Sequence, residues 1–303
     1  MGHWLRLLRP FTLLPPILGM ATGAAAAWGA LETSMLSRGR IGTVILGMVM
    51  AATLNAASNV LNQIHDLAQD RVNKPDRPLP SGALSLRCAR ISAATLYSAA
   101  LAMAWFVDVG AGHECFVIVV FTVFLTWAYS GPPLRWRRFG WRANLTIAIP
   151  RGWLLKVAGW STVAPVFSNP EPWYLGFIFF LFLLGATTTK DFADMAGDAQ
   201  EGVRNLPVRL GASRAVAIIA PFFWLPWLFL PLGAVLPGPP LSASPIGLTI
   251  LGLVCAAYGA WVHRLLARDT TRLVQDGENH PAWRHMYGLM MLAQLGSAAV
   301  YLI

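Results

Sequence analysis

Long uninterrupted apolar stretches constrain the fold of this chain more than any other feature. Over 303 residues the sequence is 56% hydrophobic and only 12% charged, whereas a soluble domain carries roughly 25% charged residues. A helix needs about 20 apolar residues to cross the bilayer core, while membrane β-strands are about 10 residues long and alternate in polarity. Because the stretches here are long and do not alternate, the sequence predicts an all-α integral membrane protein.

We expect nine transmembrane helices that pack into a bundle. The first follows two arginines, as a signal peptide would, but its apolar stretch is longer than a signal-peptide core, so we interpret it as a permanent helix. The predicted spans cover residues 10–31, 41–61, 90–107, 114–129, 143–163, 173–189, 215–236, 246–266 and 286–303.

The basic residues predict how the bundle is oriented. Lys and Arg concentrate in cytoplasmic loops. With a cytoplasmic N-terminus, every Lys and Arg except Arg38, Arg40, Arg151 and Lys156 falls on the cytoplasmic side. An odd number of spans then leaves the C-terminus outside. This topology explains the net charge of +9, so we expect the lipid bilayer as a partner and no nucleic acid.

Acidic residues are concentrated in two of the predicted cytoplasmic connections. The first acidic segment, residues 62–70, carries Asn62, Asp66 and Asp70. If the second span continues as a helix, this spacing of four places the three side chains on one face.

The second acidic segment, residues 190–198, begins with Lys190 and carries Asp191, Asp194 and Asp198. Their spacing of three and four also defines one helical face. The sequence D-M-A-G-D at 194–198 resembles D-L-A-Q-D at 66–70. We therefore expect one domain over residues 1–303, with two related halves, 1–142 and 143–303, that face each other across a shared cavity.

The paired acidic segments predict a magnesium site. Like charges at this spacing repel each other unless a cation lies between them. Mg²⁺ prefers carboxylate and phosphate oxygens and is commonly held by one or two carboxylates together with substrate phosphates. The alternative is two solvated helix ends whose acids balance nearby arginines. Two such segments on the same predicted side favour the metal site.

Basic residues near these segments are candidates for binding phosphate. Arg77 lies in a proline-stiffened loop directly after the first acidic segment, and Arg137 and Arg138 lie in the third connection. One guanidinium group can donate two parallel hydrogen bonds to the oxygens of a phosphate. Cytoplasmic loops carry arginine in any case, however. Arg151 and Lys156 fall within the predicted span 143–163, where a charge usually faces a cavity. A boundary shifted by one turn would instead place Arg151 near the interface.

Taken together, the two aspartate motifs, the N-K-P-D-R-P-L-P-S-G loop at 73–82 and the R-P-F-T-L-L-P-P stretch at 9–16 resemble the UbiA family of intramembrane prenyltransferases. The resemblance covers nearly the whole chain. It implies a helical bundle around a central cavity, in which Mg²⁺ joins both aspartate motifs to the diphosphate of the donor at the cytoplasmic side. The residues that match the metal-binding pattern are Asn62, Asp66, Asp70, Asp194 and Asp198, and Asp191 fits its longer form.

Other stretches of the chain resemble particular branches of the family. Tyr129-Ser130, the arginine-rich 135–139 stretch and the R-G-W-L-L stretch that begins at Arg151 resemble homogentisate prenyltransferases, while the D-R-P-L-P loop is nearer to chlorophyll synthases. A lysine that is frequent in the family is Arg137 here. The substrate-binding residues that we expect are Asn62, Arg77, Tyr129, Arg137, Arg138, Arg151 and Lys190.

The resemblance implies Mg²⁺-dependent transfer of a prenyl group from an isoprenyl diphosphate to an acceptor in the membrane. We expect an aromatic acceptor. A lipid alcohol, a chlorin, or cyclisation of the prenyl group without an acceptor remain alternatives within the family. A transporter whose buried charges bind ions is an alternative of another class.

Overall fold

The chain forms a bundle of helices in the computed structural model, which describes residues 2–31, 38–107, 112–200 and 202–303. These residues contain no β-strand. The helical elements, in chain order, are α1 (Gly2–Leu8), η1 (Pro10–Leu13), α2 (Leu14–Ala30), α3 (Arg38–His65), α4 (Leu67–Asn73), α5 (Leu86–Phe106), α6 (Glu114–Ser130), η2 (Trp136–Arg138), α7 (Gly140–Ala148), η3 (Ile149–Leu154), α8 (Leu155–Ser161), α9 (Pro170–Ala186), α10 (Thr189–Ala193), α11 (Met195–Gln200), α12 (Leu206–Leu210), α13 (Ala212–Ile219), α14 (Pro221–Trp224), η4 (Leu225–Leu228), α15 (Phe229–Val235), α16 (Pro245–Arg268), α17 (Thr270–Asp276), η5 (Gly277–Asn279) and α18 (Pro281–Leu302).

Five helical stretches within the described residues are long and apolar enough to cross a membrane. They match five of the predicted spans and cover Pro10–Ala30, Arg40–His65, Pro170–Ala193, Ala212–Val235 and Pro245–Arg268. The other predicted spans are helical too, but α6 is apolar and shorter, and the segment at 143–163 is divided among α7, η3 and α8. The helical fold is thus confirmed, whereas the count of nine and the orientation stay predictions.

Glycine contacts bring the divided helix η3–α8 into the middle of the bundle. A Cβ atom on Gly23 of α2 would lie only 2.7 Å from the carbonyl oxygen of Lys156, and one on Gly152 would lie 2.6 Å from the Cα of Phe180 in α9. Only glycine permits such close approach of two backbones. The glycines therefore pack α8 against α2 and η3 against α9.

A row of amide side chains on α3 binds the stretch around Arg9, where the helical backbone is interrupted between α1 and η1. Arg9 has a left-handed backbone with φ of 56°, and Pro10 follows it, so nearby carbonyl groups lose their helical donors. Asn55, Asn59 and Gln63 donate hydrogen bonds to the carbonyl oxygens of Thr12 (2.9 Å), Leu8 (3.0 Å) and Leu7 (2.7 Å). One face of α3 is consequently polar along its second half, and it leads directly to the first acidic segment.

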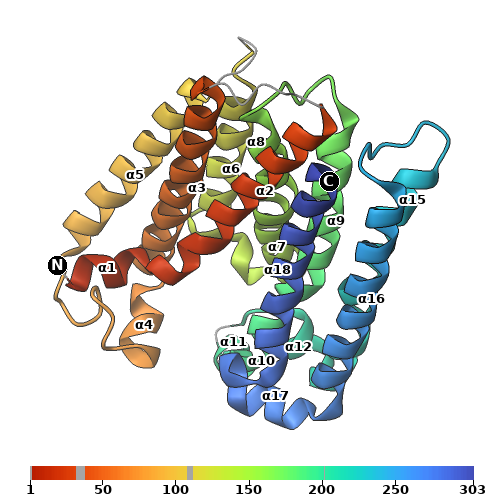
Figure 1. Ribbon diagram of the computed structural model, residues 1–303. Helices are drawn as coiled ribbons and strands as arrows, with labels where there is room; N and C mark the ends of the chain where they lie inside the picture. Colours follow the sequence, from red (N-terminus) through yellow and green to blue (C-terminus); the bar gives the residue numbers. More distant parts are fainter. Residues whose placement is uncertain (1, 32–37, 108–111, 201) are drawn as a thin grey trace.

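Both acidic segments lie at the same end of the bundle. Figure 1 shows α4, which carries much of the first segment, and the short helices α10 to α12 and α17 at the lower end of the view, while the C-terminus of α18 lies at the opposite end. This arrangement follows from chain direction, because α3 and α9 both run toward that end before their aspartates begin.

Candidate active site

The first acidic segment buries two carboxylates beside two arginines. Asp66 follows the end of α3 and Asp70 lies in α4, and their side chains are almost inaccessible, with 8% and 5% of the residue surface exposed. Arg77 donates from Nη1 to both oxygens of Asp70, at 2.8 and 2.7 Å. The proline-stiffened loop therefore folds back onto the aspartate motif that precedes it.

Arg137 joins the third connection to the first acidic segment. Its guanidinium contacts Asp66 through Nη1 and Gln69 through Nη2. Burial raises the pKa of the Asp66 carboxyl above its usual value, although the neighbouring Arg137 acts in the opposite direction. A buried carboxylate beside a cation is a common arrangement at functional sites.

The second acidic segment is more open. Asp191 is buried, and its Oδ1 lies 3.4 Å from the Nζ of Lys190. Asp194 is exposed and Asp198 is half-buried. Asp198 accepts a hydrogen bond of 2.6 Å from the Nδ2 of Asn205. Two of its three aspartates are thus accessible to a ligand from the solvent side.

The end of α6 connects the two acidic segments. Ser130 donates from Oγ to the Oδ1 of Asn62 over 3.2 Å, and the adjacent Tyr129 accepts a hydrogen bond of 3.0 Å from the Nζ of Lys190. Lys190 is also close enough to act electrostatically on Asp66. The first segment, the end of α6 and the second segment therefore surround one common region.

The structure does not bring every expected site residue to this region. Arg138 is exposed, and its carbonyl oxygen accepts a backbone hydrogen bond from Arg204. Arg151 lies in η3 and contacts Asn55 on α3. Asp66 follows Asn55 by eleven positions, which corresponds to a rise of about 16 Å along the helix.

Three polar residues of this region, Gln69, Ser130 and Asn205, were not among the expected site residues. Gln69 follows Asp66 by three positions, and this helical spacing would have indicated it. Ser130 and Asn205 reach the site through contacts with Asn62 and Asp198. No spacing in the sequence indicates the contact of Ser130, because it joins residues 68 positions apart.

The oxygen-rich side chains suit a hard divalent cation. Among the described residues, no three His, Cys, Asp or Glu side chains come together as a complete metal site. Mg²⁺ does not require such a group, because one or two carboxylates suffice when substrate phosphates supply further oxygens. The residues present therefore fit Mg²⁺ held jointly with an anionic ligand, and the facing arginines and Lys190 suit that anion.

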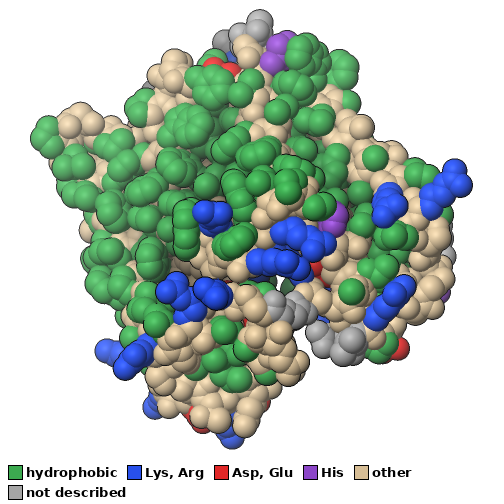
Figure 2. Space-filling view, turned by 180° about the vertical axis from the view of Figure 1, so that it is seen from behind, with side chains coloured by type: hydrophobic (Ala, Val, Ile, Leu, Met, Phe, Trp, Pro, Cys, Tyr) green, Lys and Arg blue, Asp and Glu red, His purple; other side chains and the backbone are tan. Residues whose placement is uncertain are grey.

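Basic side chains gather around a hollow on one face of the molecule. Figure 2 shows Lys and Arg side chains on both sides of this hollow, between the broad hydrophobic surface and the end of the bundle. Such a concentration of positive charge attracts an anionic ligand.

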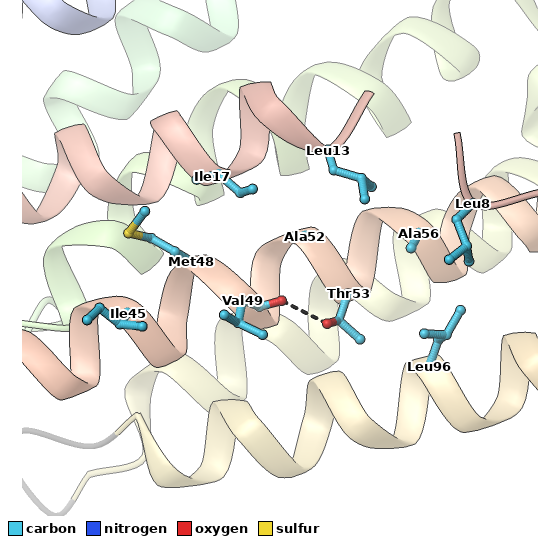
Figure 3. Close-up of a pocket in the computed structure, with 10 residues that line it drawn as sticks. All are labelled: Leu8, Leu13, Ile17, Ile45, Met48, Val49, Ala52, Thr53, Ala56 and Leu96. Atoms are coloured by element: carbon cyan, nitrogen blue, oxygen red, sulfur yellow. Dashed lines mark hydrogen bonds between the residues drawn. The ribbon is translucent and has the colours of Figure 1, made fainter. Parts of the chain in front are cut away.

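A separate apolar groove lies on the outside of the bundle. It has a volume of about 340 Å³ and is lined by Leu8, Leu13, Ile17, Ile45, Met48, Val49, Ala52, Thr53, Ala56 and Leu96, from α1 to α3 and α5. Figure 3 shows Leu13 and Ile17 on η1–α2, Leu96 on α5, and most of the other lining residues on α3 between them. Ile45 and Val49 are exposed there. The groove contains none of the expected site residues, and its surface is suited to contact with lipid.

Known proteins resemble this chain in sequence. The UbiA prenyltransferase family matches residues 12–275. The chain is 31% identical to the bacteriochlorophyll synthase 33 kDa chain of Cereibacter sphaeroides over 272 residues, which cover 88% of this chain and 83% of that protein. It is 28% identical to digeranylgeranylglyceryl phosphate synthase of Methanopyrus kandleri over 269 residues, with 86% and 91% of the two chains covered.

Solved structures share the whole architecture. A structure of digeranylgeranylglyceryl phosphate synthase superimposes with a TM-score of 0.74 at 23% identity, covering 99% of this chain and 98% of that one. A UbiA homologue from Archaeoglobus fulgidus bound to DMAPP and Mg²⁺ gives a TM-score of 0.72 at 20% identity, with 99% and 100% coverage. Five apolar helices, the family match and these relatives together identify the chain as an integral membrane prenyltransferase of the UbiA family.

Proposed function

We propose that this enzyme transfers the prenyl group of an isoprenyl diphosphate to an acceptor in the membrane, with Mg²⁺ held between the two acidic segments. The observation that carries the proposal is the pair of contacts at the end of α6, where Ser130 binds Asn62 and Tyr129 binds Lys190. These contacts align residues of both segments around one region. The Archaeoglobus homologue bound to DMAPP and Mg²⁺ supports the same combination of ligands.

The aspartates are the proposed metal ligands. Asp66, Asp70, Asp194 and Asp198 supply carboxylate oxygens, Asn62 supplies an amide oxygen, and Asp191 supports the second segment through Lys190. In the structure, Asp66 and Asp70 are paired with Arg137 and Arg77. When bound, Mg²⁺ would supply positive charge that stabilises the leaving diphosphate.

The basic residues are the proposed diphosphate ligands. Arg77, Arg137 and Lys190 already face the aspartates, so they can turn their remaining donors to the phosphate oxygens without a large movement. We assign Tyr129 to positioning the ammonium group of Lys190. Arg138 is exposed, so we assign it to the rim of the site, where it contributes to attraction of the anion.

The chemical step follows from this charge distribution. The bond between C1 of the prenyl group and the diphosphate oxygen breaks, and the diphosphate leaves with the electron pair. The allylic carbon then forms a bond with the acceptor, and the acceptor loses a proton. Water would compete for this carbon, and the apolar interior of the bundle excludes it. Positive charge opposite the leaving group stabilises the transition state.

We propose an aromatic acceptor, which binds in the interior of the bundle and is alkylated at an electron-rich ring carbon. The active site faces the cytoplasm in the proposed topology, since the basic residues gather at that end. Some relatives are named for bacteriochlorophyll and for digeranylgeranylglyceryl phosphate. A chlorin and a glyceryl phosphate are therefore the acceptors against which an aromatic acceptor should be compared.

The test is incubation of the purified protein with Mg²⁺, prenyl diphosphates of several chain lengths and a mixed set of aromatic, chlorin and lipid-alcohol acceptors, read by mass spectrometry. A prenylated aromatic product that requires Mg²⁺ supports the proposal. A prenylated chlorin or glycerol product would replace the aromatic acceptor and keep the transfer reaction. Without release of diphosphate at any chain length, the proposed transfer would be wrong.

A further inference from the structure

The first helix of the chain contacts the loop that carries Arg77. This loop, residues 74–84, connects α4 to α5 and is called the proline loop below. Figure 1 shows α1 running across the bundle, whereas α3 and α5 run along it. Arg6 of α1 donates a hydrogen bond of 2.8 Å from Nη2 to the carbonyl oxygen of Asp76, 70 positions further along the chain. The contact therefore joins the start of the chain to the residue that precedes Arg77.

The carbonyl group of Asp76 and the backbone N–H of Arg77 belong to one peptide unit. Because a peptide unit is planar, a hydrogen bond to this carbonyl oxygen limits rotation of the whole unit. On its other edge, the N–H of Arg77 donates to the carbonyl oxygen of Lys74 over 3.1 Å. The unit is thus held on both edges. The direction in which the Arg77 side chain leaves the backbone depends on the orientation of this unit.

A small hydrophobic cluster, distinct from the main core, packs α1 against the proline loop. Its buried residues come from α1, α3, the proline loop and α5, and they are Leu7, Val60, Leu79, Ala89 and Ala93. Gln63 of α3 also donates over 2.7 Å to the carbonyl oxygen of Leu7. Arg6 directly precedes Leu7, so its side chain extends from an anchored backbone. This anchoring removes much of the entropy cost that a hydrogen bond from a free chain end would carry.

Arg77 is the residue on which this contact acts. It donates to both oxygens of Asp70, and it is one of the proposed diphosphate ligands. When the donor binds, its guanidinium has to share its N–H groups between the carboxylate and a phosphate. Two-point binding of this kind requires an aligned guanidinium plane. A proline loop that is held in place keeps the guanidinium within reach, whereas a loosened loop would allow it to leave the site.

A second route by which Arg6 would act is attraction of the diphosphate through its own charge. The side chain is exposed, and salt screens such attraction beyond about 10 Å. The two routes differ in how they depend on Arg77. Positioning has an effect only when Arg77 is present, whereas direct attraction adds to the effect of Arg77. Substitution of both arginines therefore distinguishes the two routes.

We propose that Arg6 is a positioning residue of the diphosphate site, which holds the peptide unit between Asp76 and Arg77 and thereby directs the guanidinium of Arg77. The inference rests on the proposed function, which assigns Arg77 to the donor. Arg6 acts through Arg77, so its loss affects donor binding. The helix α1 thus belongs to the donor site, although it lies outside both acidic segments.

The test measures binding of a thiolo analogue of a prenyl diphosphate, which does not react, to the detergent-purified enzyme with Mg²⁺. The proteins are the unmodified enzyme, Arg6→Gln, Arg6→Lys, Arg77→Ala and the double variant of Arg6→Gln with Arg77→Ala. Arg87→Gln is the control, at an exposed arginine in the first turn of α5. Hydrogen–deuterium exchange of the proline loop, measured by mass spectrometry without Mg²⁺ or analogue, reports on the loop alone.

Arg6→Gln is expected to weaken binding of the analogue about 5-fold, the effect that loss of one net hydrogen bond gives. Arg6→Lys should keep part of the affinity, because an ammonium group also donates to a carbonyl oxygen. In the Arg77→Ala background, Arg6→Gln should cause no further loss. Unchanged binding in Arg6→Gln, the same loss in both backgrounds, or an equal loss in Arg87→Gln would overturn the inference.

The exchange measurement separates this inference from the proposed function. Within the proline loop, the N–H groups of Ser81 and Leu84 donate to the carbonyl oxygens of Arg77 and Pro78, both over 3.0 Å. A loosened loop exchanges these hydrogens faster, so Arg6→Gln should speed exchange and Arg87→Gln should not. Unchanged exchange in Arg6→Gln, together with normal binding of the analogue by the unmodified enzyme, would overturn the role of Arg6 alone. Failure of the unmodified enzyme to bind the analogue would overturn the proposed function, and with it a role of Arg6 at a diphosphate site.

Discussion

The Nζ of Lys190 donates a hydrogen bond of 3.0 Å to the hydroxyl group of Tyr129 and lies 5.6 Å from the centre of the tyrosine ring. These two residues come from different elements, α10 and α6. Their contact joins the second acidic segment to the helix end that also touches Asn62 through Ser130. The site therefore depends on α6 as much as on the two acidic segments.

Loss of one carboxylate from either segment should abolish turnover. Asp66→Asn and Asp194→Asn keep the shape of the side chain and remove the negative charge that a divalent cation requires. We expect kcat to fall by about 100-fold or more, the size of loss that follows removal of one charge-stabilising group. Asp269→Asn is the control, because this exposed residue caps α17 through Oδ1. Steady-state assays of the detergent-purified proteins measure the effect, and undiminished activity of either variant would contradict the assigned role.

Arg77→Ala should weaken donor binding more than acceptor binding. Arg77 binds both oxygens of Asp70 and is placed to share its donors with a phosphate. We expect the donor KM to rise about 10-fold, as loss of a hydrogen bond to a charged group gives. Arg77→Lys should recover only part of the affinity, because lysine lacks the planar fork. Arg87→Ala, at an exposed arginine of α5, is the control. A larger effect on the acceptor KM would remove Arg77 from the diphosphate site.

Tyr129→Phe should lower kcat/KM for the donor about 10-fold. The substitution removes the hydroxyl that holds Lys190, so the ammonium group loses its fixed position. Tyr174→Phe is the matched control, because its hydroxyl donates to the carbonyl oxygen of Phe229 over 3.0 Å, away from the site. If the two variants behave alike, the contact between Tyr129 and Lys190 has no role in the reaction.

Asp66→Asn should stabilise the protein at neutral pH while it removes activity. Burial raises the pKa of Asp66 in the folded state above its ordinary value of 3.8. The ionised form is thus disfavoured by folding, and the cost is fully present above the folded pKa and disappears below the unfolded pKa. The variant should therefore have a higher Tm than the unmodified enzyme at pH 7 without Mg²⁺ or donor. The difference should shrink as the pH falls toward 4. A constant difference across this range would show that the charge of Asp66 is not responsible.

Local patterns predicted the parts of the structure that depend on neighbouring residues. The apolar stretches at 41–61 and 173–189 predicted helices, and the spacing of Asn62, Asp66 and Asp70 predicted a polar face, which runs from the end of α3 into α4. Arg77 and Asp70 are only seven positions apart. Their contact could therefore be expected from the sequence, because Arg77 lies in the loop that directly follows the aspartate motif.

Other parts of the structure depend on tertiary contacts, which local sequence patterns do not reveal. The π-helical turn at Ile149–Leu154 depends on close packing of Gly152 against α9, and an apolar pattern alone does not reveal it. Asn55 and Asn59 bind carbonyl groups that are available because the helical backbone is interrupted at Arg9. This interruption lies in a distant segment, so the sequence around the two asparagines does not indicate their contacts. The relation between the halves 1–142 and 143–303 stays a prediction.

Substitutions in each acidic segment show directly whether both segments hold one metal ion. Mn²⁺ replaces Mg²⁺ as a paramagnetic probe, and electron paramagnetic resonance measures its binding to the purified enzyme with a thiolo analogue of the donor. We predict that Mn²⁺ binding requires the analogue and is lost both in Asp70→Asn and in Asp198→Asn. Unchanged Mn²⁺ binding after substitution in either segment would contradict a site shared between them.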